Sequence, residues 1–304
     1  MSRFTRLFFM GLFVSSSVIV TGCTDSEQHN TPAKSETTQS EVKQQAAATE
    51  NTATQNTVES EKPQSNATTE PASKTVKTAT QSAPPANLPA IPNFKDFAAG
   101  SPRKQAFFEF MAPLIKQANT HILEKRQHLQ SLMKKASLTK NDQAWLNQQA
   151  NAYNLDDFDP TNTADLNALL TRIDAIPAAL ALAQGANESA WGTSRFARKA
   201  NNYFGQWCFS KGCGLVPKQR NDGAIHEVRA FDHPYESVVS YIHNLNSHRT
   251  YQKLREIRAK TRQKGQTPTG LEMAEGLINY SARKHKYVKE LQSMIRYNNL
   301  TQYN

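Results

Sequence analysis

The 304-residue sequence lacks the marks of several large protein classes. It has three cysteines, and no pair of cysteines or histidines stands at the spacing of a zinc site. It shows no zinc-finger or helix-turn-helix signature and no internal repeat, so its formal net charge of +10 does not indicate a nucleic-acid-binding protein. We therefore expect no metal, no cofactor and no nucleic-acid partner, and we expect the protein to act as a monomer.

The N-terminal segment has no apolar run long enough to predict a transmembrane helix. Arg3 and Arg6 precede residues 7–20, an apolar stretch interrupted by serines, as in secretory signal peptides. Cys23 follows a small residue at the end of this stretch, which resembles the lipobox of bacterial lipoproteins. Residues 1–22 are thus predicted to be a lipoprotein signal peptide, with Cys23 lipidated as the first residue of the mature protein. An ordinary secretory peptide cleaved nearby is the alternative.

Residues 24–93 contain almost no large apolar side chains and are rich in Thr, Ser, Gln, Ala and Pro. Such a segment cannot bury enough apolar surface to offset the entropy cost of ordering it. We expect residues 23–93 to form a lipid-anchored, disordered tether. Residues 94–304 are long enough for one domain with a core of its own.

The domain is basic, whereas the tether is acidic. Residues 94–304 carry 29 basic and 18 acidic side chains, and the tether carries five lysines and eight acidic residues. A basic secreted domain indicates an anionic partner such as a cell-wall polymer or lipid headgroups. Thr24, rather than an Asp, follows Cys23, which resembles signals that sort lipoproteins to the outer membrane. The predicted location is the periplasmic face of the cell envelope.

With Cys23 assigned to lipidation, Cys208 and Cys213 remain as an even pair. The turn-like spacer Phe-Ser-Lys-Gly separates them. A leftover pair of cysteines in a secreted chain predicts a disulfide, here one that closes a small loop. Two free thiols are the alternative.

The globular domain is predicted to be mainly helical, because its apolar residues recur at helical spacing. Pro113 is expected to bend or divide the first helix, Thr163 to cap the third and Gly192 to end the fourth. The predicted helices are residues 103–135, 141–153, 165–176, 177–192, one that starts at about 234, 270–280 and 285–297.

A small β-hairpin lobe is predicted between residues 201 and 232. Four glycines and a proline interrupt the chain there, and residues 224–231 alternate in type as a strand does. The fold class is therefore mainly α with a small β-lobe.

Glu188 is the lone carboxylate in residues 180–192, an apolar run that predicts a buried helix. Burial disfavours the charged form of a carboxyl group, so its pKa rises and it can serve as a general acid. A glycosidase needs such a group to protonate the leaving oxygen. The alternative is a Glu at a helix end that reaches solvent or pairs with Arg195.

Glycoside hydrolysis usually needs a second carboxyl group on a facing element. Asp222, Glu227, Asp232 and Glu236 are the candidates. Strand alternation places Glu227 on one face with Arg229, which would keep it ionised, or would simply pair with it on a solvated strand. Asp232 and Glu236 are interpreted as helix caps.

Aromatic residues are concentrated around Glu188 and the loop after it. Such rings stack on the apolar faces of sugars, although core packing explains them more often. They are Trp191, Tyr203, Phe204, Trp207 and Phe209.

Three motifs in order resemble the Bax-type branch of the bacterial glucosaminidase family, the mannosyl-glycoprotein endo-β-N-acetylglucosaminidase-like enzymes. They are residues 187–194, residues 201–205, and Tyr280-Ser281 followed by Tyr287. The resemblance covers about residues 165–300. It implies a lysozyme-like helical fold with a β-lobe and cleavage of the β-1,4 bond after N-acetylglucosamine in peptidoglycan.

The resemblance also implies roles for particular residues. Glu188 is the general acid, Tyr280 lines the cleft beside it, and Glu227 on the β-lobe is the second catalytic carboxylate. Where some branches have Thr-Thr-Glu, this chain has Ala-Ile-His-Glu, so the inverting, retaining and substrate-assisted mechanisms all stay open. The expected substrate-binding residues are Trp191, Asn202, Tyr203, Phe204, Gly205 and Tyr287.

Two other functions remain open at this point. A lytic transglycosylase also carries a helix-borne Glu-Ser motif and needs only one carboxylate. A non-catalytic lipoprotein could bind the wall through its basic charge.

Overall fold

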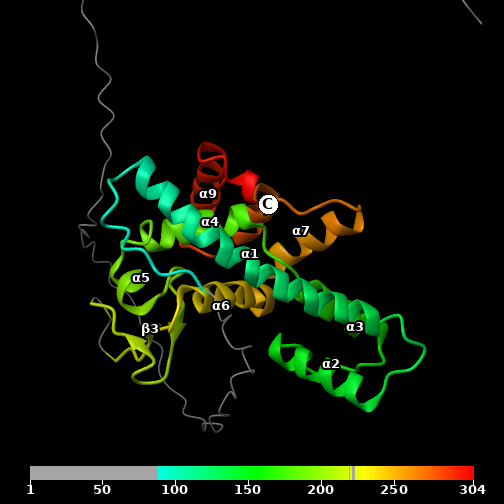
Figure 1. The fold of residues 1–304 in the computed structure, drawn as a ribbon. Coiled ribbons are helices and arrows are strands. Elements are labelled where there is room, and N and C mark those ends of the chain that lie inside the picture. Colours follow the sequence, from blue (N-terminus) through cyan, green and yellow to red (C-terminus); the bar gives the residue numbers. More distant parts are fainter. Residues whose placement is uncertain (1–87, 219, 221–222) are drawn as a thin grey trace, which may run out of the picture. The chain divides into compact units, whose positions relative to one another are not determined.

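Helices predominate in the part of the chain that the computed structural model describes, residues 88–218, 220 and 223–304 (Figure 1). This confirms the predicted mainly α fold with a small β-lobe. Cys23, Asp222 and nearly all of the predicted tether lie outside the described residues. Among those residues, no helix is long and apolar enough to cross a membrane.

The helices follow the predicted order, with two additions that the sequence analysis missed, α5 and α7. The α-helices are α1 (Ser101–Leu132), α2 (Lys140–Ala152), α3 (Thr163–Arg172), α4 (Ala178–Ser189), α5 (Arg195–Ala200), α6 (Pro234–Ser247), α7 (Gln252–Gln263), α8 (Gly270–Ala274) and α9 (His285–Tyr297). Short 3₁₀ turns span Arg249–Tyr251, Glu275–Leu277 and Leu300–Tyr303.

Helix α1 continues through Pro113, so the expectation that this proline divides the helix is wrong. Met111 and Leu114, on either side of the proline, are fully buried, and the helix packs against α4 and α6. Burial of this apolar face along the whole helix outweighs the local cost of one missing backbone hydrogen bond.

Helix α4 lies at the centre of the domain, between α1, α8, α9 and the last 3₁₀ turn. Every residue from Ala178 to Ala186 is buried. Small side chains allow this close approach: a Cβ on Gly185 would lie 3.3 Å from the Phe204 ring. A helix buried on all sides needs an apolar sequence all round, and this one has it.

Helix α4 ends earlier than predicted. Ala190 adopts the left-handed conformation and terminates it after Ser189, two residues before Gly192. The Ser189 hydroxyl then accepts the backbone N–H of Gly192 at 2.8 Å. Gly192 is still required, because its φ is +75° and a Cβ there would lie 2.2 Å from the Phe94 ring.

Three other predicted boundaries need correction. Asn162, rather than Thr163, caps α3, because its side chain accepts the N–H groups of Ala164 and Asp165. The same helix ends at Arg172, not at Ile176, and the final helical stretch before Tyr280 is α8 and one 3₁₀ turn rather than a single helix.

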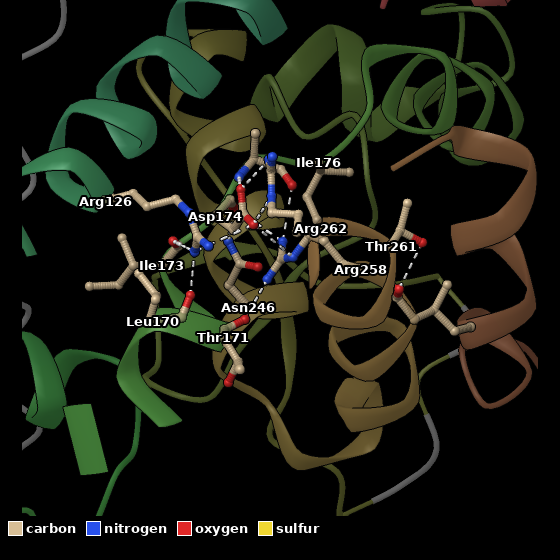
Figure 2. Close-up of polar contacts among 12 residues, drawn as sticks. Arg126, Leu170, Thr171, Ile173, Asp174, Ile176, Asn246, Arg258, Thr261 and Arg262 are labelled. Carbon is tan, nitrogen blue, oxygen red and sulfur yellow. Dashed lines mark hydrogen bonds and ion pairs between the residues drawn. The ribbon is translucent and has the colours of Figure 1, made fainter. Parts of the chain in front are cut away.

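The turn between α3 and α4 is fixed by Asp174, a buried carboxylate shared by three arginines (Figure 2). Arg262 of α7 binds it through Nε at 2.5 Å and Nη2 at 2.6 Å. Arg126 of α1 and Arg258 of α7 lie 3.4 and 3.6 Å from the same carboxylate. Arg126 and Arg258 also donate to main-chain carbonyls of residues 170–175. This cluster ties the start of α4 to α1 and α7.

The β-lobe is a three-stranded antiparallel sheet of order β1-β3-β2, built from β1 (Trp207–Cys208), β2 (Gly214–Leu215) and β3 (Glu227–Arg229). The strand expected over residues 224–231 is thus only three residues long. The Cys208–Cys213 disulfide, which the sequence predicted, closes the loop between β1 and β2, with a Cα–Cα distance of 6.2 Å.

Replacement of Asp174 by Asn should destabilise the domain strongly. Three guanidinium groups would remain around a neutral amide, and removing one partner from a buried ion cluster costs about 3–5 kcal/mol. The midpoint of urea unfolding, measured for Asp174→Asn beside Glu256→Gln on exposed α7 surface, checks this. Equal midpoints for the two variants would show that Asp174 does not hold this turn.

Candidate active site

Glu188 occupies the last turn of α4, where the buried helix reaches a cluster of tyrosines. Its side chain is half-buried, and its Oε1 accepts a hydrogen bond from the Tyr287 hydroxyl at 2.8 Å. The Asn187 side chain donates to the same oxygen at 3.4 Å. The alternative partner, Arg195, donates instead to the carbonyl of Val216 at 3.1 Å.

A directed chain of hydrogen bonds leads to Glu188 through the core. The Tyr241 hydroxyl donates to Gln184 Oε1 at 2.6 Å, and Gln184 Nε2 donates to the Tyr287 oxygen at 3.1 Å. The Tyr287 hydroxyl is therefore left to donate to Glu188. Because Gln184 Oε1 and the Tyr287 oxygen each accept a hydrogen bond from the preceding group, the direction of donation along this series of hydrogen bonds is fixed.

Gln184 is the candidate site residue that the sequence analysis missed. It is fully buried in α4 and lies four residues before Glu188, so both side chains project from one face of the helix. The signal was present in the sequence as a single amide within an otherwise apolar run. Buried amides are rare without hydrogen-bond partners, and these partners come from α6 and α9.

Tyr280 and Phe204, both predicted site residues, complete the cluster. The Tyr280 ring stacks on Tyr287 with centroids 5.5 Å apart and planes 4° apart, and its hydroxyl donates to the carbonyl of Phe204 at 3.2 Å. Phe204 in turn stacks on Tyr241 at 4.0 Å. The structure thus brings Glu188, Tyr280, Tyr287 and Phe204 together around one carboxyl group.

Burial raises the pKa of Glu188 above its usual range, and this is the largest effect on the group. The hydrogen bonds from Tyr287 and Asn187 act in the opposite direction, as does the charge of Arg283. Burial and the nearby Glu188 charge also raise the pKa of Tyr287, so the phenol stays protonated and remains a donor. A carboxyl group of this kind can hold a proton and release it to a substrate oxygen.

Glu227 has the opposite electrostatic character. Its side chain is buried in the β-lobe, where the backbone N–H groups of Gly212 and Gly214 donate to its two oxygens at 3.0 and 2.8 Å. These bonds lower its pKa. The alternative pairing with Arg229 is not formed, because that guanidinium lies over the Phe231 ring at 5.1 Å. Glu227 therefore stays ionised.

The two cysteine sulfurs lie beside Glu227, with ligand-type atoms of all three residues within 4.8 Å of one another. A metal would need thiolates at these positions, and both sulfurs are used in the disulfide. The cluster therefore stiffens the loop that holds the Glu227 carboxylate.

Asn202 and Tyr203, predicted to bind substrate, are buried and make contacts within the domain. The Asn202 amide donates to the carbonyls of Gln206 and Arg229, each at 2.9 Å, and its oxygen accepts the N–H of Gly205 at 2.8 Å. Tyr203 packs on Phe94 and two phenylalanines of α1. Gly205 supplies a φ of +71° at this turn. Together they join α5 to the β-lobe.

Trp191 packs edge-on against Phe107 and Phe108 of α1, with the Lys104 ammonium 5.1 Å from its ring centroid. Trp207 and Phe209 on the β-lobe are instead 59% and 64% exposed. The aromatic residues that the sequence analysis placed in one group therefore have different surroundings: Trp191 packs against α1, whereas Trp207 and Phe209 are exposed.

Asp232 and Glu236 lie at the start of α6. Glu236 Oε2 accepts the N–H of Asp232 at 3.3 Å, in agreement with its interpretation as a helix-start residue. The N-cap itself is His233, not Asp232, because the His233 ring accepts the N–H of Tyr235 at 3.0 Å.

Comparison with known proteins gives a family match. Residues 164–300 match the glucosaminidase family model, described as mannosyl-glycoprotein endo-beta-N-acetylglucosaminidase. The chain is 32% identical over 209 residues to the protein Bax of Escherichia coli (strain K12). The aligned region covers 69% of this chain and 74% of that protein. A solved structure, the catalytic domain of the autolysin Auto from Listeria monocytogenes, is 18% identical, with a TM-score of 0.33, over 59% of this chain and 97% of that chain.

The chain therefore belongs to the glucosaminidase family, in its Bax-type branch. This confirms the resemblance inferred from the three motifs. The class of protein is a glycoside hydrolase of the cell wall, and Glu188, Tyr280 and Tyr287 all lie within the matched residues.

Replacement of Tyr287 by Phe should shift the pH dependence of hydrolysis. The lost hydrogen bond favours the ionised form of Glu188, so its removal raises the pKa of that group further. A general acid works in its protonated form, so the alkaline limb of the kcat/KM profile should move to higher pH, with a rate loss of about tenfold. Tyr297→Phe on the exposed face of α9 is the matched control. An unmoved limb would show that Tyr287 does not influence the ionisation of Glu188.

Proposed function

We propose that this protein is a peptidoglycan hydrolase that cleaves the β-1,4 glycosidic bond after N-acetylglucosamine, with Glu188 as the general acid. The observation that carries the proposal is the half-buried carboxyl of Glu188 at the end of the Tyr241–Gln184–Tyr287 hydrogen-bond chain. Membership of the glucosaminidase family supports the substrate class.

In this proposal Glu188 protonates the oxygen of the leaving sugar as the bond breaks, and the carboxyl becomes a carboxylate. The Tyr287 hydroxyl is already aimed at Oε1, so it strengthens its bond to the charge that develops there. An interaction that is stronger in the transition state than in the ground state lowers the barrier. Oε2 is the oxygen left to carry the proton, since the Tyr287 and Asn187 bonds both reach Oε1.

Glu227 is the proposed second carboxylate. It is held ionised by two backbone N–H groups, which suits a group that activates water or stabilises an oxocarbenium-like transition state. Tyr280 and the turn at residues 202–205 would line the sugar site on the helical side, and Trp191 would support it from behind. Stacking of Tyr280 on Tyr287 keeps the acid's hydrogen-bond partner in place.

A second route, that of a lytic transglycosylase, is favoured by one observation: Glu188 is the carboxylate that contacts the tyrosine cluster, whereas Glu227 is bound within the β-lobe. A transglycosylase needs only one carboxyl group, which first donates and then accepts a proton. The two routes leave different products. Hydrolysis after N-acetylglucosamine gives reducing-end N-acetylglucosamine, and transglycosylation gives anhydro-muramic ends.

The proposed setting is the periplasmic face of the cell envelope, with the domain acting as a monomer on peptidoglycan. Lipidation of Cys23 and attachment to the outer membrane remain predictions from the sequence, since Cys23 lies outside the described residues.

Replacement of Glu188 by Gln should abolish most turnover while the fold is kept, because the amide is isosteric but cannot donate an acidic proton. The expected loss is on the order of 10²–10⁴ in rate. Digests of sacculi by wild type, Glu188→Gln and the exposed control Glu109→Gln, analysed by mass spectrometry, check both the rate and the product. Near-wild-type release of fragments by Glu188→Gln would refute its role.

Replacement of Glu227 by Gln should lower the rate on the order of 10², since a neutral amide cannot stabilise developing positive charge. The melting temperature must be measured alongside, because the amide would oppose the N–H of Gly212 or Gly214. A variant with normal melting and an unchanged rate would contradict a catalytic role. The acetamido group of the substrate would then be the better candidate for the second function.

A further inference from the structure

Arg283, between the 3₁₀ turn Glu275–Leu277 and α9, places a positive charge beside the candidate acid. Its guanidinium carbon lies 5.5 Å from the centroid of the Tyr287 ring, and the Tyr287 hydroxyl donates to Glu188 at 2.8 Å. The charge of Arg283 also acts on Glu188, whose pKa it lowers. One aromatic ring and one hydrogen bond therefore separate the guanidinium from the carboxyl group.

The Arg283 guanidinium is held by one acidic partner and keeps unused donors. Nη1 lies 2.6 Å from Glu290 Oε2, and the two side chains are 45% and 39% exposed. An ion pair at this exposure stabilises the fold little. Within the described residues, Arg283 Nε and Nη2 make no hydrogen bond. Two neighbouring donors are therefore available for a carboxylate, which arginine binds through such a fork.

The segment around Arg283 carries an excess of positive charge. Residues 280–297 contain five Lys or Arg side chains and one acidic side chain, Glu290. Three of these cations, Lys284, Lys286 and Lys289, are exposed. Exposed charges of one sign attract an anion of the opposite sign. This side of the candidate active site is therefore suited to a negatively charged group of the substrate.

We propose that Arg283 binds a carboxylate of the acidic peptide stem that branches from the glycan substrate, and so favours stem-bearing over bare glycan. The inference rests on the proposed function and deepens it by naming the residue that recognises the peptide. The substrate carboxylate meets Nε and Nη2 of Arg283, while Nη1 stays with Glu290.

The stem can reach Arg283 because of where it joins the sugar. Cleavage after N-acetylglucosamine makes the muramic sugar the leaving group, and in this sugar the stem is attached at the ring position next to the leaving oxygen. Glu188 protonates that oxygen in the proposed reaction, so the base of the stem lies beside the Glu188 carboxyl group. An extended peptide spans about 3.5 Å per residue. The first few residues of the stem therefore cover the distance across the Tyr287 ring.

Arg283→Gln tests the proposal, because the amide stays polar but lacks the charge and the forked donors. Arg296→Gln is the matched control. Its side chain is exposed and lies nine residues after Tyr287 on α9, about 13 Å along the helix axis. Arg283→Lys keeps the charge and loses the fork.

The probes are defined glycan fragments of three kinds: without stems, with stems, and with stems whose carboxylates are converted to amides. Binding to the full chain is measured by calorimetry, with turnover blocked by Glu188→Gln in every protein. The ratio of affinities, stem-bearing over stem-free, should fall about 5- to 10-fold in Arg283→Gln, fall less in Arg283→Lys and stay unchanged in Arg296→Gln. Amidated stems should lose the same factor on the protein that keeps Arg283, and Arg283→Gln should cause no further loss with them.

Equal ratios in the Arg283→Gln and Arg296→Gln proteins would overturn the proposal, as would amidated stems that bind as tightly as acidic ones. The amidated probe decides the question without any change at Arg283, so it does not depend on how that variant folds. These outcomes are separate from failure of the proposed function. That failure would appear as near-wild-type turnover by Glu188→Gln in the sacculus digest, whatever the affinity ratios are.

Discussion

The burial of helix α4 from Ala178 to Ala186 is the constraint on which the rest of the structure depends. Its residues from Ala178 to Ala186 leave no face in water, so every neighbouring helix must pack against it. Two of its polar residues, Gln184 and Glu188, are spaced four residues apart and have specific partners. The carboxyl group at the end of such a helix has a raised pKa, chiefly because burial disfavours its charged form.

A different set of polar contacts holds each end of α4. Asp174 and three arginines fix the turn at its start to α1 and α7. At its end the Tyr287 hydroxyl from α9, on which Tyr280 stacks, donates to the Glu188 carboxyl group. The Asp174 cluster fixes the position of the helix, and the Tyr287 hydrogen bond influences the protonation of Glu188. Glu188 and Glu227 thus have opposite environments: burial disfavours the charged form of Glu188, whereas two backbone N–H groups favour the charged form of Glu227. Such a difference in pKa is how paired carboxylates take different roles.

The fold class, the family and the disulfide could be predicted from the sequence, because helical periodicity, three ordered motifs and an even cysteine pair are local signals. Contacts between distant segments could not. The Gln184 chain needs tyrosines from α6 and α9, and Asp174 gathers arginines 48 residues before it and up to 88 residues after it. Local rules also failed where packing outweighed them: Pro113 lies inside a continuous helix, and α4 stops at Ala190, a residue without a glycine's freedom.

The central claim is that Glu188 is a proton-bearing acid in the free protein. Side-chain carboxyl NMR titration of the full chain, with Glu188 assigned by comparison with Glu188→Gln, measures this directly. The account predicts that Glu188 titrates at higher pH than an ordinary glutamate, while Glu227 titrates at lower pH. A Glu188 carboxyl that ionises at or below the ordinary range, about 4.3, would contradict it.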